Sequence, residues 1–296
     1  MFIILTQGMF YYCIIQPSLQ HITKLPAISG KNLCYLIIAS VLIAAAGNII
    51  NDYFDLNIDR VNKPHKVVIE KVINRRWAIA WHIVLSGLGI LLSFHVSKRT
   101  GLLWIGPANA LSVLLLFIYS ASLKKKFLIG NILVSLLTAW VILVLSLSQI
   151  ELHRSLQASS SASRAIFKFG MVYAGFAFII SLIREVIKDM EDVDGDTRYG
   201  CKTMPIVWGL NAGKVFVAVW LIVLIASLSI IQFYTLQLGW IYSAVYCFFF
   251  IIIPLLLIFK RLYTAQTPGD FHKLSTAVKI TMLSGIVSIA ILKVYL

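Results

Sequence analysis

Oxygen-bearing side chains recur at every fourth position near residue 50, where Asn51, Asp55 and Asp59 follow one another. At about 100° per residue, a helix places these three within about 80° of one face. Asn48 and Asp52 lie close to the same stripe. Oxygen ligands on one stripe repel one another unless a cation neutralises them, and Mg2+ prefers one or two carboxylates together with water and phosphate oxygens. The pattern therefore predicts a magnesium site; the alternative is a helix end whose acids simply face water.

A second acidic cluster begins at Glu185, at the end of another apolar run. If the helix continues, its four carboxylates fall within about 60° of one face. These are Glu185, Asp189, Asp192 and Asp196. We expect Gly195 to end this helix, because glycine adopts the left-handed conformation common just after a helix end, and Asp196 would then lie beyond that end. Two carboxylate stripes suit a diphosphate that is bridged by two metal ions.

Basic residues adjoin both clusters and could contact phosphate oxygens directly. They are Arg60, Arg184, Lys188 and Lys202. Each of them, taken alone, is more often an anchor at the cytoplasmic membrane surface. Phosphate binding by a glycine-rich loop is excluded, because the chain has no Walker-type or GxGxxG element.

Composition identifies the environment in which these residues act. The chain has 296 residues, 59% of them hydrophobic and 13% charged, whereas about 25% is usual for soluble domains. Apolar runs long enough to span a membrane recur along its whole length. We expect an all-α polytopic membrane protein, one domain over residues 1–296, with a first span that is retained rather than cleaved as a signal peptide. The nine predicted spans are 1–19, 33–51, 77–96, 102–119, 128–148, 167–186, 213–233, 238–259 and 274–296.

The distribution of basic residues predicts the orientation. Fifteen Lys and Arg lie in the loops 52–76, 120–127, 187–212 and 260–273, against six in 20–32, 97–101, 149–166 and 234–237. By the positive-inside rule the first set is cytoplasmic, which places the N-terminus in the cytoplasm and the Ser-rich stretch 157–163 in an outer loop, as a linker. Both acidic clusters follow even-numbered spans, so both emerge on the cytoplasmic face. Loop placement explains most of the net charge of +14, and we expect no nucleic-acid partner.

The motifs resemble those of the UbiA family of intramembrane prenyltransferases. Asn51-x3-Asp55-x3-Asp59 is similar to the family's first aspartate-rich motif, and Glu185-x6-Asp192-x3-Asp196 is similar to its second. The resemblance extends to Lys202-Thr203-Met204-Pro205 followed by Gly209, and to Tyr119-Ser120-x3-Lys124 before Gly130-Asn131. It implies nine helices around a central cavity, two Mg2+ ions held by the motifs and a side opening for lipid substrates. The sequence departs from the family in that it lacks an Arg-Pro element before the first helix and has Glu185 where many members have aspartate.

Residue roles follow from the motifs and the resemblance together. The expected catalytic residues are Asp55, Asp59, Asp192, Asp196, Lys188 and Tyr119. The expected substrate-binding residues are Asn48, Asn51, Arg60, Lys124, Arg184 and Lys202. The expected metal ligands are Asn51, Asp55, Asp59, Glu185, Asp189, Asp192 and Asp196. Aromatic side chains could shelter a carbocation by cation–π contact, although ordinary packing explains each of them as well. These are Tyr53, Phe54, Tyr119 and Trp208.

The implied reaction is transfer of a prenyl group from an isoprenoid diphosphate to a lipid acceptor within the membrane. The run from Arg184 to Pro205 is similar to the archaeal-type ether-lipid branch, which favours geranylgeranyl diphosphate as donor and a prenylated glycerol phosphate as acceptor. The alternative acceptor is an aromatic quinone precursor such as 4-hydroxybenzoate or dihydroxynaphthoate. A transporter is disfavoured because transporter sites lie near the bilayer midplane, whereas these acids lie at helix ends. A lipid-binding scaffold would not need paired metal-binding motifs.

Overall fold

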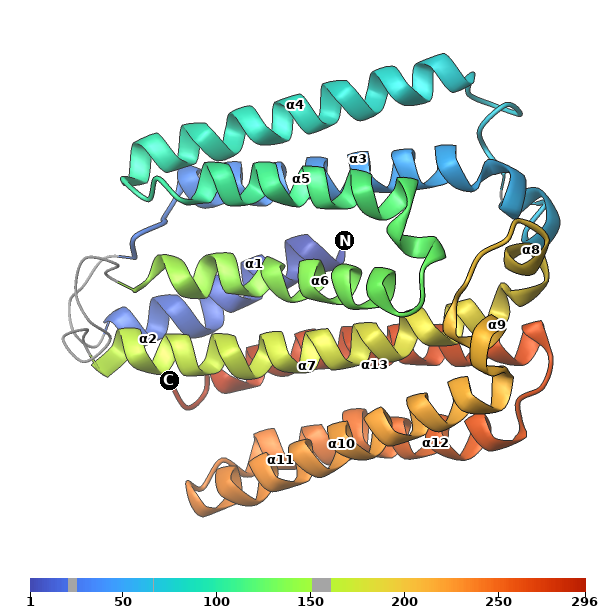
Figure 1. Cartoon of the computed structure of the whole chain (residues 1–296). Coiled ribbons are helices and arrows are strands. Elements are labelled where there is room, and N and C mark those ends of the chain that lie inside the picture. The colour runs from blue at the N-terminus through green and yellow to red at the C-terminus, as the bar shows by residue number, and fades with distance from the viewer. Residues whose placement is uncertain (21–25, 66, 151–160) are drawn as a thin grey trace. The chain divides into compact units, whose positions relative to one another are not determined.

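The computed structural model describes residues 1–20, 26–65, 67–150 and 161–296, and it is helical throughout these ranges apart from turns, loops and one isolated bridge between Ile69 and Ile73. Figure 1 shows the helices in chain order. The longer ones are α3 (Lys31–Asn62), α4 (Arg75–Thr100), α5 (Ile105–Ala121), α6 (Ile129–Ser148), α7 (Ser161–Glu191), α10 (Leu210–Gln237), α12 (Ile253–Thr264) and α13 (Pro268–Leu292). The shorter ones are α1 (Phe2–Phe10), α2 (Gln16–Gln20), α8 (Val193–Arg198), α9 (Met204–Trp208) and α11 (Ile241–Cys247). Part of the predicted Ser-rich linker, residues 157–160, lies outside the described residues.

Long apolar helices account for most of the described chain. Eight helical segments within it are long and apolar enough to cross a membrane, and α5, at the position of the predicted fourth span, is a ninth apolar helix of 17 residues. The predicted all-α, multi-pass membrane architecture is therefore confirmed. The count of nine spans remains a prediction.

The chain forms two compact units, each assembled from separate stretches of sequence. Unit 1 comprises Met1–Pro26, Thr138–Glu191 and Trp208–Leu296, and unit 2 comprises Ala27–Leu137 and Asp192–Val207.

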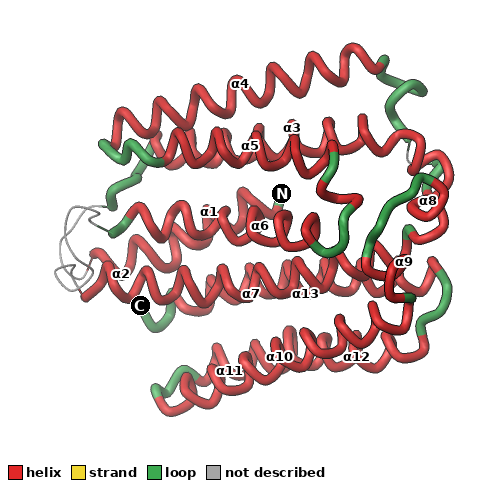
Figure 2. The backbone as a smooth tube through the Cα atoms, in the orientation of Figure 1, coloured by secondary structure: helices red, strands yellow, loops and turns green. Residues whose placement is uncertain are grey.

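Unit 2 is built on α3, α4 and α5, which run side by side, with α8 against the end of α3 (Figure 2). Glycines allow these helices to approach closely. A β-carbon at Gly89 of α4 would lie 2.8 Å from Ile43 Cγ1 of α3, and one at Gly47 of α3 would lie 2.9 Å from Leu116 Cδ1 of α5. Close packing thus fixes the axis of α3, the helix that carries the first acidic motif.

In unit 1, α7 packs against both α13 and α10. The phenol of Tyr173 and the hydroxyl of Ser288 lie 3.1 Å apart and join α7 to α13. α13 begins with a capping box, in which Thr267 accepts from the backbone N–H of Asp270 while the Asp270 carboxylate accepts from that of Thr267. Unit 1 also encloses a largely apolar cavity of about 500 Å³, lined by side chains of α1, α6, α7, α10, α11 and α13 among others.

Candidate active site

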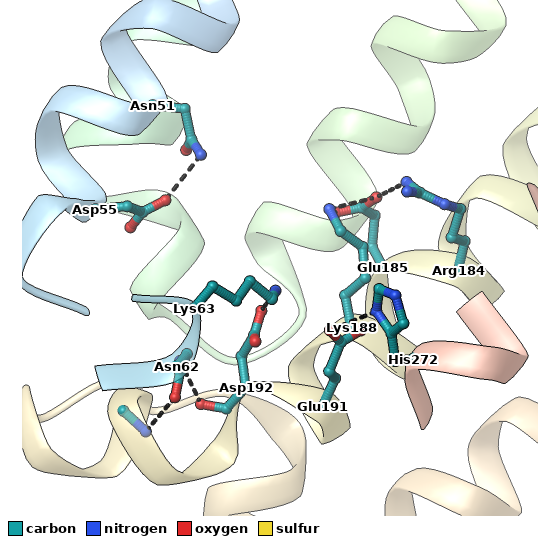
Figure 3. A network of polar contacts seen from close by, with 11 residues as sticks. Asn51, Asp55, Asn62, Lys63, Arg184, Glu185, Lys188, Glu191, Asp192 and His272 are labelled. Atoms are coloured by element: carbon teal, nitrogen blue, oxygen red, sulfur yellow. Dashed lines mark hydrogen bonds and ion pairs between the residues drawn. The ribbon is translucent and has the colours of Figure 1, made fainter. Parts of the chain in front are cut away.

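The first acidic motif lies on one continuous helix, as its spacing predicted. α3 extends to Asn62, eleven residues beyond the predicted end of the second span, so the polar residues emerge as part of the helix rather than as a loop. The Asn51 amide donates to Asp55 Oδ2 over 2.8 Å (Figure 3). Because both side chains lie on one face, the amide fixes the position of the carboxylate.

Lys124 neutralises this part of the motif. It comes from the turn after α5, and its ammonium lies 2.6 Å from Asp55 Oδ1 and 3.1 Å from Asn51 Oδ1. Only 10% of the Lys124 side chain is exposed. Burial lowers the pKa of Lys124, and the adjacent Asp55 carboxylate opposes that shift. The site therefore holds a desolvated cation beside a carboxylate, an arrangement that can receive a phosphate.

The second motif reaches the first through the end of α3. The Lys63 ammonium lies 2.7 Å from Asp192 Oδ2, and the Asn62 amide donates to the Asp192 carbonyl over 3.0 Å (Figure 3). The backbone N–H of Gly195 in turn donates to Asn62 Oδ1 over 2.7 Å. Unit 2 thus brings together residues that are about 130 positions apart in the sequence.

Carboxylates of the two motifs interact electrostatically. Burial, followed by the nearby charges of Asp192 and Asp55, raises the pKa of Asp196 to about 7. The backbone around it is held in place, because the N–H of Lys202 donates to the Lys125 carbonyl over 2.7 Å. Burial and the neighbouring carboxylates thus disfavour the ionised form of Asp196, and a divalent cation bound beside it would favour that form.

The helix that carries the second motif is broken, contrary to the sequence prediction. α7 ends at Glu191, Asp192 has non-helical dihedral angles (φ −101°, ψ 9°), and α8 begins at Val193. The four acids therefore do not share one helical stripe. Gly195 lies inside α8 instead of ending a helix, because its missing side chain makes room for Asn62.

Unit 1 holds the remaining acids of the second motif, at the C-terminal end of α7. Glu185 is 9% exposed, and it pairs with Arg184 over 3.1 Å and with Lys188 over 3.2 Å. Asp189 is half-buried. One turn further along, Glu191 Oε1 lies 2.9 Å from Nδ1 of His272, which ties α7 to the start of α13 (Figure 3). Both cations that were expected to bind phosphate here are thus adjacent to a carboxylate.

The positions of the other predicted site residues give less evidence about their roles. Asn48 is exposed on α3, Tyr119 is half-buried on α5, and the Lys202 side chain is exposed. Arg60 is exposed and paired with Glu70, a residue that the sequence analysis did not consider. Asn62 and Lys63 were not predicted as site residues, although both lie about one helical turn after Asp59 and could have been included on that ground.

The oxygen-only donor set fits Mg2+, which takes carboxylate and amide oxygens in preference to nitrogen or sulfur. Within the described ranges, however, no three acidic, histidine or cysteine side chains converge closely enough to hold a metal ion. Lys63 and Lys124 occupy carboxylate oxygens of Asp192 and Asp55. A metal ion that bound these same oxygens would displace the two ammonium groups, which would then be free to contact a phosphate.

The chain is similar in sequence to proteins of known activity. A family model described as the UbiA prenyltransferase family matches residues 21–283. A digeranylgeranylglyceryl phosphate synthase of Methanosphaera stadtmanae is 32% identical over 90% of this chain and 91% of the relative. The protein of the same name in Methanothermobacter thermautotrophicus is 33% identical over 78% of this chain and 72% of the relative.

Solved structures show the same fold. A UbiA homolog from Aeropyrum pernix K1 aligns over 96% of both chains with a TM-score of 0.64 at 16% identity. A UbiA homolog from Archaeoglobus fulgidus bound to DMAPP and Mg2+ aligns over 98% of this chain and 99% of the other, with a TM-score of 0.54 at 13% identity.

Proposed function

Because this chain belongs to the UbiA prenyltransferase family, we propose that it transfers a geranylgeranyl group from geranylgeranyl diphosphate to geranylgeranylglyceryl phosphate. The family membership confirms the resemblance stated from the motifs, and the enzyme is a membrane-bound prenyltransferase. The family match draws on both units, which we propose act as one catalytic domain over residues 1–296. The acceptor is taken from the relatives, which are named as digeranylgeranylglyceryl phosphate synthases.

The contact between the two aspartate-rich motifs in unit 2 supports this function most strongly. Asn62 and Lys63, at the end of the first motif, hold Asp192 of the second. A donor diphosphate carries charge on several oxygens, so it needs cations from more than one side. Asp55 of α3 pairs with Lys124, and Asp192, just before α8, pairs with Lys63. Together with bound metal ions, these two lysines would place cations on more than one side of the diphosphate.

In the mechanism that we propose, four carboxylates would hold the metal and two lysines would hold phosphate oxygens. The carboxylates are Asp55, Asp59, Asp192 and Asp196. When bound, magnesium stabilises the charge that develops on the diphosphate as the allylic C–O bond breaks. Lys63 and Lys124 donate hydrogen bonds to the same leaving group and stabilise it most once that bond has broken. The glycerol hydroxyl of the acceptor then forms the new ether bond to the allylic carbon and passes its proton to the released diphosphate.

The apolar cavity of unit 1 is evidence in favour of a lipid substrate. Its lining is almost entirely hydrocarbon, and its volume of about 500 Å³ is within the range of ligand pockets in proteins. An isoprenoid chain is also hydrocarbon, so it can pack against this lining without burying a polar group. We place such a chain there in the substrate complex.

We further propose that both acidic motifs face the cytoplasm. The loops on their side of the membrane carry 15 of the Lys and Arg residues, against six on the opposite side. This orientation places the N-terminus in the cytoplasm as well.

The acceptor is tested by product analysis. Purified protein receives isotope-labelled geranylgeranyl diphosphate with, in separate reactions, geranylgeranylglyceryl phosphate, 4-hydroxybenzoate and dihydroxynaphthoate. Mass spectrometry is expected to detect a labelled diether phosphate only. A prenylated aromatic acid without any diether phosphate would overturn the acceptor assignment and leave the prenyltransferase chemistry standing.

A further inference from the structure

Glu70 has a left-handed backbone conformation that glutamate rarely adopts. Its φ is +69°, and among the described non-glycine residues Leu128 alone shares a positive φ. Neighbouring residues impose this conformation: Glu70 N–H donates to the Ile73 carbonyl over 2.8 Å, and the buried Ile69 belongs to a small apolar cluster with Leu56 and Ala78. Glycine would adopt the same turn without strain.

The contacts of the Glu70 side chain stabilise the fold too little to offset this backbone strain. Its carboxylate pairs with Arg60, and its Oε1 lies 2.9 Å from Arg75 Nε. All three side chains are exposed, at 37% for Glu70, 53% for Arg60 and 45% for Arg75. Ion pairs this exposed contribute little, less than the usual cost of a left-handed glutamate. The exposed ion pairs therefore do not offset the cost of a left-handed glutamate, which favours a further role for its carboxylate.

Arg60 lies on a different side of α3 from Asp55, and Arg75, the first residue of α4, approaches Tyr53 of α3. Arg60 is five residues after Asp55, which turns it about 140° around the helix. Tyr53 is seven residues before Arg60 and so within about 20° of it, and the Arg75 guanidinium lies 5.8 Å from the centre of the Tyr53 ring. Arg60, Arg75 and Tyr53 therefore form a cationic site of their own, which we name the arginine site.

Apolar side chains around the arginine site point to a membrane rather than to water. Val72, in the turn after Glu70, is 79% exposed, and Trp77, two residues after Arg75, is 62% exposed. Tryptophan and valine exposed beside arginines, at the ends of membrane-spanning helices, are typical of the interface where lipid headgroups lie.

We propose that Arg60 and Arg75 bind the phosphate headgroup of an anionic membrane lipid, and that Glu70 holds the two guanidinium groups as an internal anion when no such lipid is bound. Guanidinium groups bind phosphate oxygens in pairs, so a phosphate can take the place of the carboxylate between them. Removing the Glu70 charge should then strengthen lipid binding, because the lipid no longer competes with it. A purely structural role for Glu70 predicts no such gain.

Native mass spectrometry of detergent-purified protein titrated with dioctanoyl phosphatidic acid tests the proposal. Glu70→Gln should bind this lipid about tenfold more tightly than the wild type, and Arg60→Gln/Arg75→Gln about tenfold more weakly. Glu70→Gly, which also removes the strain, should match Glu70→Gln in affinity without a lower melting temperature. The matched control is Lys98→Gln/Arg99→Gln, two exposed cations at the other end of α4, which should bind as the wild type does.

Each other result counts against the proposal. Wild-type affinity in the arginine double variant, or an equal loss in the control, would show that the lipid binds elsewhere. Unchanged lipid affinity in both Glu70 variants would show that Glu70 does not act as an internal anion that competes with the lipid. Competition distinguishes a lipid headgroup from free phosphate as the ligand. Excess inorganic phosphate should not displace the lipid. If inorganic phosphate displaced the lipid and bound equally well, the ligand of the site would be free phosphate and the proposal would be wrong. Equal binding of dioctanoyl phosphatidylcholine would exclude a site selective for anionic lipids.

Discussion

Substituting Gly195 by alanine should disable the enzyme by separating the two aspartate-rich motifs. A β-carbon at Gly195 would lie 2.5 Å from Asn62 Oδ1 and 2.6 Å from Asn62 Cγ, closer than such atoms can approach. Either Asn62 rotates away or α8 moves off α3. Both routes break the hydrogen bond from Gly195 N–H to Asn62 and the one from Asn62 to the Asp192 carbonyl.

The magnitude follows from these two hydrogen bonds. Each contributes about 1 kcal/mol, so their loss costs about 2 kcal/mol. If that energy serves to position Asp192 and Asp196, its loss lowers kcat/KM about 30-fold. A displacement of the carboxylates of about 1 Å would have an effect of similar size or larger.

The assay is kcat/KM for prenyl transfer, measured together with thermal unfolding in detergent. Asn62→Ala removes the same two hydrogen bonds without a clash and should lose a similar amount. In Gly195→Ala/Asn62→Ala the obstructing side chain is gone, so the double variant should be no worse than either single one. Thr197→Ala, an exposed change on the same helix, serves as control and should resemble the wild type. Wild-type activity in Gly195→Ala, or losses that multiply in the double variant, would refute this explanation.

Three further predictions address the metal, the donor and the orientation. Chelation by EDTA should abolish prenyl transfer and added Mg2+ should restore it, because the clustered carboxylates would repel the donor diphosphate without a divalent cation between them; activity that survives chelation would contradict this. Lys124→Gln should raise the KM for the diphosphate donor about tenfold while activity still depends on Mg2+, because the lost ammonium group contacts phosphate; an unchanged KM would exclude Lys124 from the donor site. In intact cells carrying a cysteine-free variant, an impermeant thiol reagent should label Arg99→Cys and leave His65→Cys unlabelled; the reverse pattern would invert the proposed orientation.

Local sequence patterns predicted the helices and the first acidic face well. Apolar runs located each long helix to within a few residues at most ends, because bilayer thickness sets the length of an apolar span. The four-residue spacing placed Asn51, Asp55 and Asp59 on one helix, since α3 continues through them. Both patterns depend on neighbours along the chain, which a single sequence reports directly.

Contacts between distant segments were beyond those patterns. Lys124 pairs with Asp55 and Lys63 pairs with Asp192 across 69 and 129 positions of sequence, respectively. The break at Asp192 was not predicted either, because helical periodicity continues through the acidic run and the break depends on how α8 packs against α3. The left-handed turn at Glu70 was not predicted either, because glycine is the residue that indicates such a turn and this position holds glutamate.

Manganese binding tests most directly whether acids of both motifs together hold a metal-bound diphosphate. Electron paramagnetic resonance can count Mn2+ bound to the purified protein in the presence of geranylgeranyl thiodiphosphate, a donor analogue that reacts slowly. We predict bound Mn2+ in the wild type and its loss in both Asp55→Asn and Asp192→Asn. Asp194→Asn, which alters an exposed acid two residues from Asp192, should keep it. Full Mn2+ binding in the Asp55 and Asp192 variants would contradict the account.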